Sequence, residues 1–178
     1  MNKIKISLDK RAINHYIVHL STKLAFNYSQ GRYMSVDHRA RKLYFSLKSI
    51  FLHIDNREKG LLAQFNITIP RFYILMHIHV HPGINYIELS DLLLCTKGNT
   101  TRVVGAMQQD GLVTRLVNPE DRRSYHLYLT EQGEILFKEV YSAYINQIDQ
   151  LINKFSEDQL KTYSAVSAHI EKVFEPMP

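Results

Sequence analysis

A change of hydrophobic period near residue 112 constrains the fold of this 178-residue chain more than any other feature. Before it, apolar residues recur every three or four positions, which predicts helices. Over residues 112–117 and 124–129 they alternate with polar ones, which predicts two strands joined by a polar turn at 118–123. After Thr130 the helical period returns. We therefore expect a mainly helical fold with a small two-stranded β wing.

Capping residues bound most of the expected helices. Asn85 with Glu88, and Ser156 with Gln159, have the spacing of a capping box. Thr68, Thr96 and Thr130 are expected to cap three more helices, and Gly111 suits a left-handed helix end. The helices are expected over about residues 10–28, 38–64, 69–79, 86–94, 97–110, 131–154 and 157–174.

Two of these helices carry specific burial expectations. The stretch 38–64 is so rich in apolar residues that we expect it to be buried on more than one side. The short helix 86–94 is expected to bury Ile87, Leu89, Leu92 and Leu93.

Composition and charge narrow the function classes. The chain is 45% hydrophobic and 22% charged, an ordinary globular mix, and its net charge is +5. Residues 1–60 hold 12 basic and 4 acidic side chains, whereas residues 131–178 hold 4 and 8. The basic third is expected to face either a polyanion or the acidic third. The single cysteine, Cys95, excludes an internal disulfide, and the absence of an apolar leader or spanning run predicts a cytoplasmic protein.

Two short helices followed at once by a charged ribbon form the pattern of a winged helix-turn-helix. The second of these helices begins with small, polar and basic residues, and this first stretch contains no large apolar side chain. Such residues contact base edges in a major groove, and a free helix N-terminus attracts phosphate. The residues concerned are Thr96, Lys97, Gly98, Asn99, Thr100, Thr101 and Arg102.

The turn of the ribbon carries a basic motif. Arg122 and Arg123 stand beside Asp121, whose carboxylate is expected to orient one guanidinium. An arginine on a narrow projection fits a minor groove, where a narrow A·T tract concentrates negative potential. A charged turn alone is usually only solvated, but its distance from the polar helix start favours DNA binding.

Residues 88–133 resemble the MarR family of winged-helix transcription regulators. The matching elements are Glu88-Leu89, the helix start at 96–102, Asp110-Gly111-Leu112-Val113 with Arg115, Asp121-Arg122-Arg123, and Leu129-Thr130 with Gly133. A looser resemblance extends over about 38–174. It implies a homodimer in which each subunit places helix 97–110 in the major groove and Arg123 in the minor groove. It also implies repression that a small ligand or oxidation relieves.

The resemblance divides the chain into four parts. Residues 1–37 are an N-terminal helical extension, 38–66 a dimerisation helix, 67–130 the DNA-binding lobe, and 131–178 the C-terminal dimerisation helices. Only some family members have such an extension.

Two residues depart from the family pattern. Ser90 occupies a tightly packed position where alanine is more usual. Cys95 lies in the helix break, whereas the reactive cysteine of the family's peroxide sensors is near the N-terminus. We expect Cys95 to be a half-buried filler; a redox switch is the alternative.

Other candidate sites are less complete. His77 and His81 share a helix face at a spacing that suits a metal, but no acid or cysteine nearby in sequence completes a site. The resemblance suggests that Tyr73 and Met76, with His77, line a pocket for an aromatic or anionic effector; a plain core stripe is the alternative. Nothing indicates a catalytic set, a phosphate loop or a cofactor, so an enzyme is not expected.

The sequence therefore predicts a dimeric transcription regulator that binds a pseudo-palindromic operator in double-stranded DNA, and the resemblance implies a repressor that a small ligand relieves. Lys97, Arg115 and Arg122 are expected to contact phosphates, which gives salt-dependent affinity. Thr96, Asn99, Thr100 and Thr101 are expected to select bases. Two alternatives remain: a sensor gated by metal or redox chemistry, and a winged-helix module that binds protein and not DNA.

Overall fold

The computed structural model describes residues 38–119, 121 and 124–175. The expected helix at 10–28 lies outside these residues. The chain divides into two compact units, residues 1–57 and 58–178, and the boundary falls inside one helix. The described helices do not include one long and apolar enough to cross a membrane.

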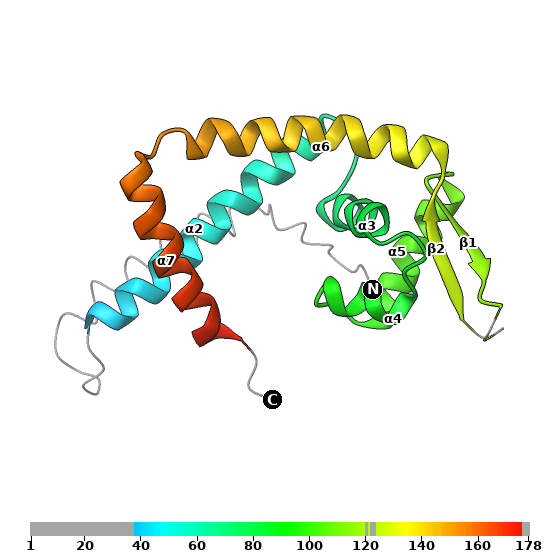
Figure 1. Ribbon diagram of the computed structural model, residues 1–178, viewed down its shortest axis with the longest axis horizontal. Coiled ribbons are helices and arrows are strands. Elements are labelled where there is room, and N and C mark those ends of the chain that lie inside the picture. Colours follow the sequence, from blue (N-terminus) through cyan, green and yellow to red (C-terminus); the bar gives the residue numbers. More distant parts are fainter. Residues whose placement is uncertain (1–37, 120, 122–123, 176–178) are drawn as a thin grey trace, which may run out of the picture. The chain divides into compact units, whose positions relative to one another are not determined.

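Figure 1 shows the order of the described elements, in which helices precede and follow a small wing. Six helices and one two-stranded antiparallel sheet are described, so the predicted fold class is confirmed. The helices are α2 (His38–Ala63), α3 (Ile69–Val80), α4 (Tyr86–Leu92), α5 (Lys97–Gln109), α6 (Glu131–Ile152) and α7 (Glu157–Phe174). The strands are β1 (Val113–Val117) and β2 (Tyr125–Leu129).

The core of the second unit is built around α3. Phe72, Ile74, Leu75 and Ile78 of this helix are all almost completely buried. They cover several sides of the helix, and α3 accordingly packs against α4, α5, α6 and β2. A helix that is apolar on most of its circumference must be enclosed in this way.

The loop before α4 pairs with β2 through backbone hydrogen bonds, on the side of β2 away from β1. Gly83 N–H donates to the carbonyl oxygen of Leu127 (2.8 Å), and Leu127 N–H donates to the carbonyl oxygen of Ile84 (3.0 Å). His126 Nδ1 also donates to the carbonyl oxygen of Gly83 (2.6 Å). Gly83 has φ +89°, a conformation that glycine adopts without the steric cost of a Cβ. The end of α3 is thus bonded to β2.

A second junction joins the base of the wing to α6. The Thr130 hydroxyl donates to the carbonyl oxygen of Gly111 (2.6 Å) and accepts from Gly133 N–H (3.0 Å). Thr130 N–H donates to the carbonyl oxygen of Leu112 (3.1 Å). Gly133 lies directly against that carbonyl, because a Cβ built on it would be only 2.1 Å from the oxygen. The short Leu-Thr-x-x-Gly motif therefore fixes where α6 begins.

The local signals for helix ends are confirmed. Both capping boxes form, at Asn85 with Glu88 and at Ser156 with Gln159. Thr96 and Thr130 accept from the backbone N–H three residues later, as expected. Thr68 occupies the N-cap position of α3, but the prediction of a side-chain cap there is wrong, since its hydroxyl makes no capping hydrogen bond.

The burial expectations for two helices are wrong within the single chain. Most apolar residues of α2 are exposed, among them Leu43, Ile50, Phe51 and Ile54. In α4 only Leu89 of the four expected residues is fully buried; Ile87 and Leu92 are exposed and Leu93 is half-buried. Helical period shows which residues share a face but not whether the same chain covers that face.

Gly133→Ala is expected to destabilise the protein, because the new methyl group meets the backbone oxygen of Leu112. Overpacking against backbone costs about 1–3 kcal/mol of unfolding free energy, and this site is at the upper end. The matched control is Gly60→Ala in α2, where nothing lies within 4 Å of the added Cβ. That variant should gain roughly 0.5–1 kcal/mol. Urea unfolding of both variants measures the difference, and equal stabilities would contradict this account of the junction.

Candidate nucleic-acid interface

The start of α5 is an open, polar helix terminus. Thr96 accepts from Asn99 N–H (3.4 Å), and the first turn contains no acidic residue. The side chains of Lys97, Asn99 and Arg102 are exposed. The uncapped N–H groups and the helix dipole favour an anion at this end.

The prediction that Thr100 contacts a base is wrong. Thr100 is 2% exposed and its hydroxyl donates to the carbonyl oxygen of Thr96 (3.3 Å). It shares the inner face of α5 with Val104 and Met107, so it belongs to the core and cannot reach a base. Thr101 is exposed, but its hydroxyl donates to the carbonyl oxygen of Lys97 (2.8 Å). That hydroxyl can therefore offer a partner only acceptor capacity while this bond persists.

Asn99 and Arg102 form a pair on the outer face of α5. A guanidinium nitrogen of Arg102 donates to Asn99 Oδ1 (3.1 Å). Residues three apart lie on neighbouring positions of a helix surface, so this bond follows from their spacing. The sequence analysis placed both residues at the interface but did not predict that they bond to one another.

The break between α4 and α5 is exposed. Leu94 has φ +50° and is 91% exposed. Cys95 is also exposed, which corrects the expectation of a half-buried filler. Its N–H donates to the carbonyl oxygen of Ser90 (3.0 Å). Ser90 itself is buried and satisfies its hydroxyl by donating to the carbonyl oxygen of Tyr86 (2.5 Å), which explains how a polar residue occupies this packed position.

The wing presents Arg115 in a fixed position. Its guanidinium lies over the ring of Tyr125, 4.3 Å from the ring centre, in a cation–π contact. Asp121 accepts from the N–H of Ser124 through its backbone carbonyl oxygen (2.9 Å). Arg122 and Arg123 lie outside the described residues, so the expected contact between Asp121 and a guanidinium is not placed.

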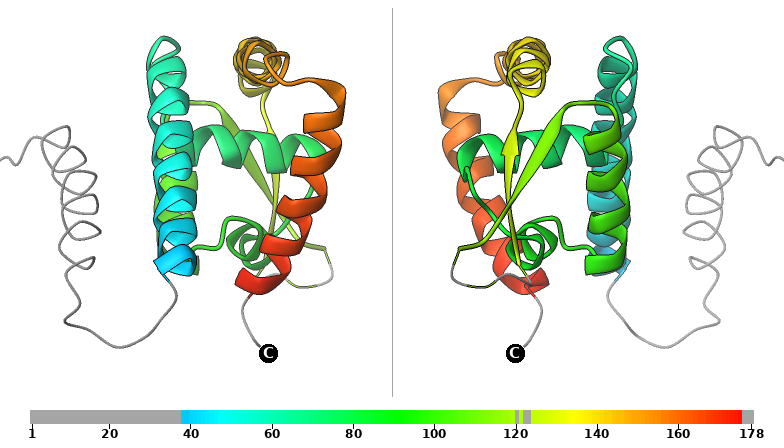
Figure 2. Two further views of the ribbon diagram at one scale, coloured as in Figure 1. Left: turned by 90° about the vertical axis from the view of Figure 1, so that its left-hand side faces the viewer. Right: turned by 90° about the vertical axis from the view of Figure 1, so that its right-hand side faces the viewer.

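The open end of α5 and the turn end of the wing point the same way. Figure 2 shows the start of α5 and the ends of β1 and β2 that border the turn at the same lower end of this unit. Both elements belong to the unit of residues 58–178. A polar helix terminus and a basic ribbon on one side are the arrangement of a winged helix-turn-helix that meets a duplex.

Comparison with known proteins decides the family. The MarR family profile matches residues 67–125, which span α3 to the start of β2. This match assigns residues 67–125 of the chain to the MarR family. MarR proteins are DNA-binding transcription regulators and not enzymes, so the predicted function class is confirmed at this level.

Individual relatives agree with the family assignment. An HTH-type transcriptional regulator of Bacillus subtilis, YsmB, is 26% identical over 118 residues, which cover 66% of this chain and 81% of the relative. The transcriptional repressor MprA of Escherichia coli is 33% identical over 112 residues, covering 61% of this chain and 64% of the repressor. The crystal structure of Streptococcus pneumoniae FabT in complex with DNA has the same fold, with a TM-score of 0.70 and 21% identity. The match covers 76% of this chain and 97% of FabT.

An ion pair that the sequence analysis missed holds the far end of α5. Arg71 of α3 pairs with Asp110, the C-cap residue of α5. A charged residue inside the otherwise apolar helix α3 was the available signal. The pair ties α5 to the core helix α3 at the end of α5 opposite its open terminus.

The suggested effector residues of this MarR-family chain lie on α3. Tyr73, Met76 and His77 are all half-buried. Tyr73 donates to Glu58 Oε1 (3.3 Å), as does Tyr144 (3.1 Å), and the two hydroxyl oxygens are 3.3 Å apart. Burial is the main cause that raises the pKa of both phenols, and the Glu58 carboxylate adds to it. These contacts join three helices, and residue spacing gave no sign of them.

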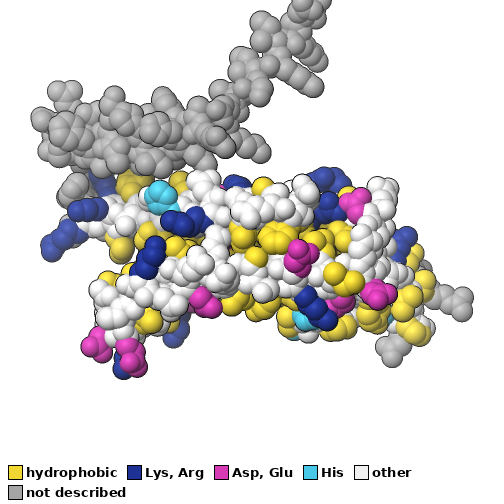
Figure 3. All heavy atoms as spheres, turned by 90° about the horizontal axis from the view of Figure 1, so that it is seen from above, with side chains coloured by type: hydrophobic (Ala, Val, Ile, Leu, Met, Phe, Trp, Pro, Cys, Tyr) yellow, Lys and Arg dark blue, Asp and Glu magenta, His cyan; other side chains and the backbone are white. Residues whose placement is uncertain are grey.

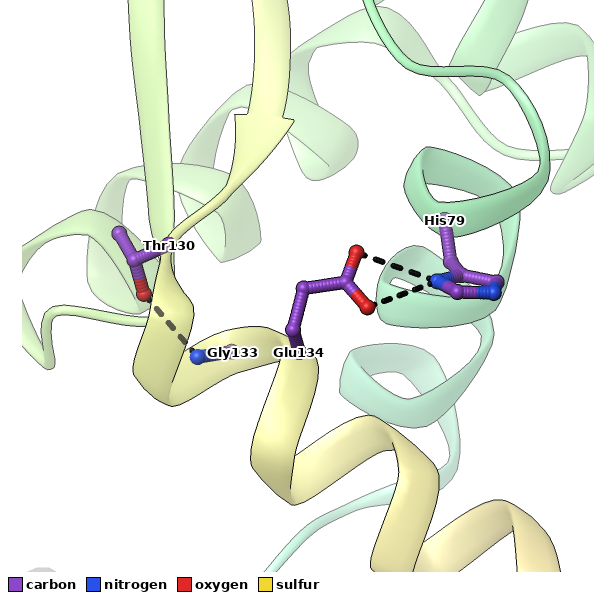
Figure 4. A network of polar contacts seen from close by, with 4 residues as sticks. All are labelled: His79, Thr130, Gly133 and Glu134. Carbon is purple, nitrogen blue, oxygen red and sulfur yellow. Dashed lines mark hydrogen bonds and ion pairs between the residues drawn. The ribbon is translucent and has the colours of Figure 1, made fainter.

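The histidines of α3 do not assemble a metal site among the described residues, where no group of three metal-binding side chains occurs. Figure 4 shows instead that the Glu134 carboxylate of α6 points at the ring of His79. His79 Nδ1 lies 2.9 and 3.1 Å from the two carboxylate oxygens, and the ring packs against Phe137. His79, which the metal hypothesis did not use, thus joins α3 to α6.

The pKa of His77 is lowered from 6.5, mainly by burial and also by His81. The unfolded chain therefore takes up a proton at a higher pH than the folded chain. As pH falls below about 6.5, protonation favours the unfolded state, so this histidine makes stability fall. His77→Gln should flatten the decline of the unfolding free energy between about pH 7.5 and 5.5. His169→Gln, in exposed α7, is the control, and identical slopes for wild type and His77→Gln would disprove the effect.

Proposed function

We propose that this MarR-family chain acts as a dimer that recognises a pseudo-palindromic site in double-stranded DNA. The observation that carries the proposal is the shared orientation of the open start of α5 and the turn end of the wing (Figure 2). FabT of Streptococcus pneumoniae, whose fold this chain shares, has been crystallised in complex with DNA. Two copies are needed because a single winged helix offers little contact surface to a duplex.

The proposed contacts are of two kinds: contacts to phosphates, which position the protein on DNA, and contacts to base edges, which select the sequence. Lys97 and Arg115, with Arg122, contact phosphates and give affinity that is independent of sequence. Asn99 and Arg102 face base edges from the first two turns of α5, and Thr96 and Thr101 lie at the edge of that surface. Gly98 leaves room for the backbone to approach, since nothing lies within 4 Å of a Cβ built there. Arg123 enters the minor groove, with Asp121 beside it.

The terminal helices are proposed to form the dimer interface. None of the residues of α7 is buried, and an apolar stripe along it is exposed: Tyr163, Val166, Val173 and Phe174. Hydrophobic side chains are also visible at the surface in the view down onto α6 (Figure 3). Apolar area of this extent on a monomer indicates a surface that another chain covers. Residues 38–66 and 131–178 are the parts that the proposal assigns to dimerisation.

Val166→Glu is expected to shift the protein from dimer to monomer, because it places a charge in the apolar stripe of α7. The matched control is Ala168→Glu, which adds the same charge on the polar side of the same helix. Sedimentation velocity over a concentration series measures the dissociation constant, which should rise at least tenfold for Val166→Glu alone. Unchanged association of a folded Val166→Glu protein would exclude α7 from the interface.

Arg123→Ala is expected to weaken binding to the operator by about 1–3 kcal/mol, the usual cost of a lost groove contact. Gel-shift titrations against the protein's own promoter region, over a salt series, measure it. Lys154→Ala, between α6 and α7, removes one positive charge away from the interface and serves as the control.

Wild-type affinity should also fall steeply as salt rises, because counterions are released from phosphates. A protein-interaction module would show no such binding, and full affinity in a folded Arg123→Ala dimer would refute the wing assignment.

Repression that a small ligand relieves is the finer part of the proposal. An effector near Tyr73, Met76 and His77 would meet the Glu58 carboxylate, which already accepts from two phenols. A carboxylate repels an anion, so these contacts favour an aromatic effector without a negative charge over an anionic one. Such a ligand would act by separating or joining α2, α3 and α6 at this cluster.

A further inference from the structure

On the outer face of α5, Arg102 lies between two glycines that have open space beside them. Arg102 is exposed, and Gly98 and Gly105 lie about one turn before and after it on the same side of the helix. Nothing lies within 4 Å of a Cβ built on either glycine. The helix backbone on both sides of Arg102 is therefore accessible to a close partner. Such access is needed if the helix is to approach the floor of a DNA groove.

The charge on this face is not neutralised by its own helix. The sequence of α5 contains no aspartate or glutamate, and Lys97 lies on a different side of the helix from Arg102. Among the described residues, Arg102 donates a side-chain hydrogen bond to the neutral Asn99 Oδ1 (3.1 Å). The guanidinium thus keeps its full positive charge and most of its five N–H donors.

The bond to Asn99 gives the guanidinium a direction. One N–H of the planar group is engaged, so rotation about the end of the side chain is restricted and the opposite edge presents parallel donors. Because one of the two acceptor sites of Asn99 Oδ1 is engaged, Asn99 offers a partner its two NH2 donors and one remaining acceptor site. The surface that the pair presents therefore donates hydrogen bonds and accepts few.

A surface of donors selects the base that has two acceptors. In the major groove guanine offers N7 and O6 as adjacent acceptors, whereas adenine offers N7 beside an N–H donor. We propose that Arg102, oriented by Asn99, selects a guanine in each half of the DNA site. This inference rests on the proposed DNA-binding function, and in it Arg102 reads the base while Asn99 is a positioning residue.

The test begins with duplexes selected from a randomised library by the full-length wild-type protein. We expect a guanine at one position in each half-site, with a preference over adenine of roughly 5- to 150-fold, as bidentate contacts give. Replacing that guanine by 7-deazaguanine removes the N7 acceptor and should weaken binding by at least about fivefold. Selected sites that lack a shared guanine would overturn the inference.

The decisive variant is Arg102→Lys, which keeps the charge but loses the planar pair of donors. It should retain the salt dependence of binding and lose most of the preference for guanine, and 7-deazaguanine should no longer affect it. Asn99→Ala should lower the preference by about fivefold with the salt dependence unchanged, and Asn99→Gln, which keeps a neutral amide oxygen as an acceptor for Arg102, should restore much of it. Retained guanine preference in Arg102→Lys would overturn the inference.

Different results would reject guanine selection by Arg102 and DNA binding itself. Binding to duplex DNA with steep salt dependence but without guanine preference rejects only the role of Arg102 and Asn99. If wild-type protein enriches no duplex and binds none at low salt, the proposed function itself fails, and this inference fails with it.

Discussion

The hydroxyl of Thr130 is the contact on which the geometry of the second unit depends. It bonds on one side to the end of the turn after α5 and on the other to the first turn of α6, while the Thr130 N–H reaches the carbonyl oxygen of Leu112. Three elements thus meet at one residue: the helix proposed to read DNA, the wing, and the long helix that leaves the wing. Gly133 makes this possible because only a residue without a Cβ fits against the Leu112 carbonyl.

Much of this fold was predictable because its signals are local. Capping boxes, the change of hydrophobic period and the left-handed Gly111 depend on residues a few positions apart, and the structure has them where the sequence indicated. Gly133 matched the family motif, but the sequence did not give the physical reason. That reason is the proximity of Leu112, a residue from before the wing.

The site was harder to predict than the fold. The stretch from Thr96 to Arg102 is uniformly small and polar, so its pattern does not separate the outer from the inner face. Helical rotation does: Thr100 lies four residues before Val104 and turns into the core, whereas Asn99 faces outward. The cluster of Glu58 with Tyr73 and Tyr144 was out of reach, because its members are up to 86 residues apart and only packing brings them together.

The hydrogen bonds between Gly83 and Leu127 have a mechanical consequence. They tie the end of α3 to the strand that leaves the wing turn, while Arg71 ties the beginning of α3 to the far end of α5. The central helix is therefore attached at one end to β2 and at the other to α5. A tilt of α3 would displace the ribbon and α5 together. If the proposed effector binds beside Glu58 and Tyr73, it could therefore change the alignment of both elements without touching either one.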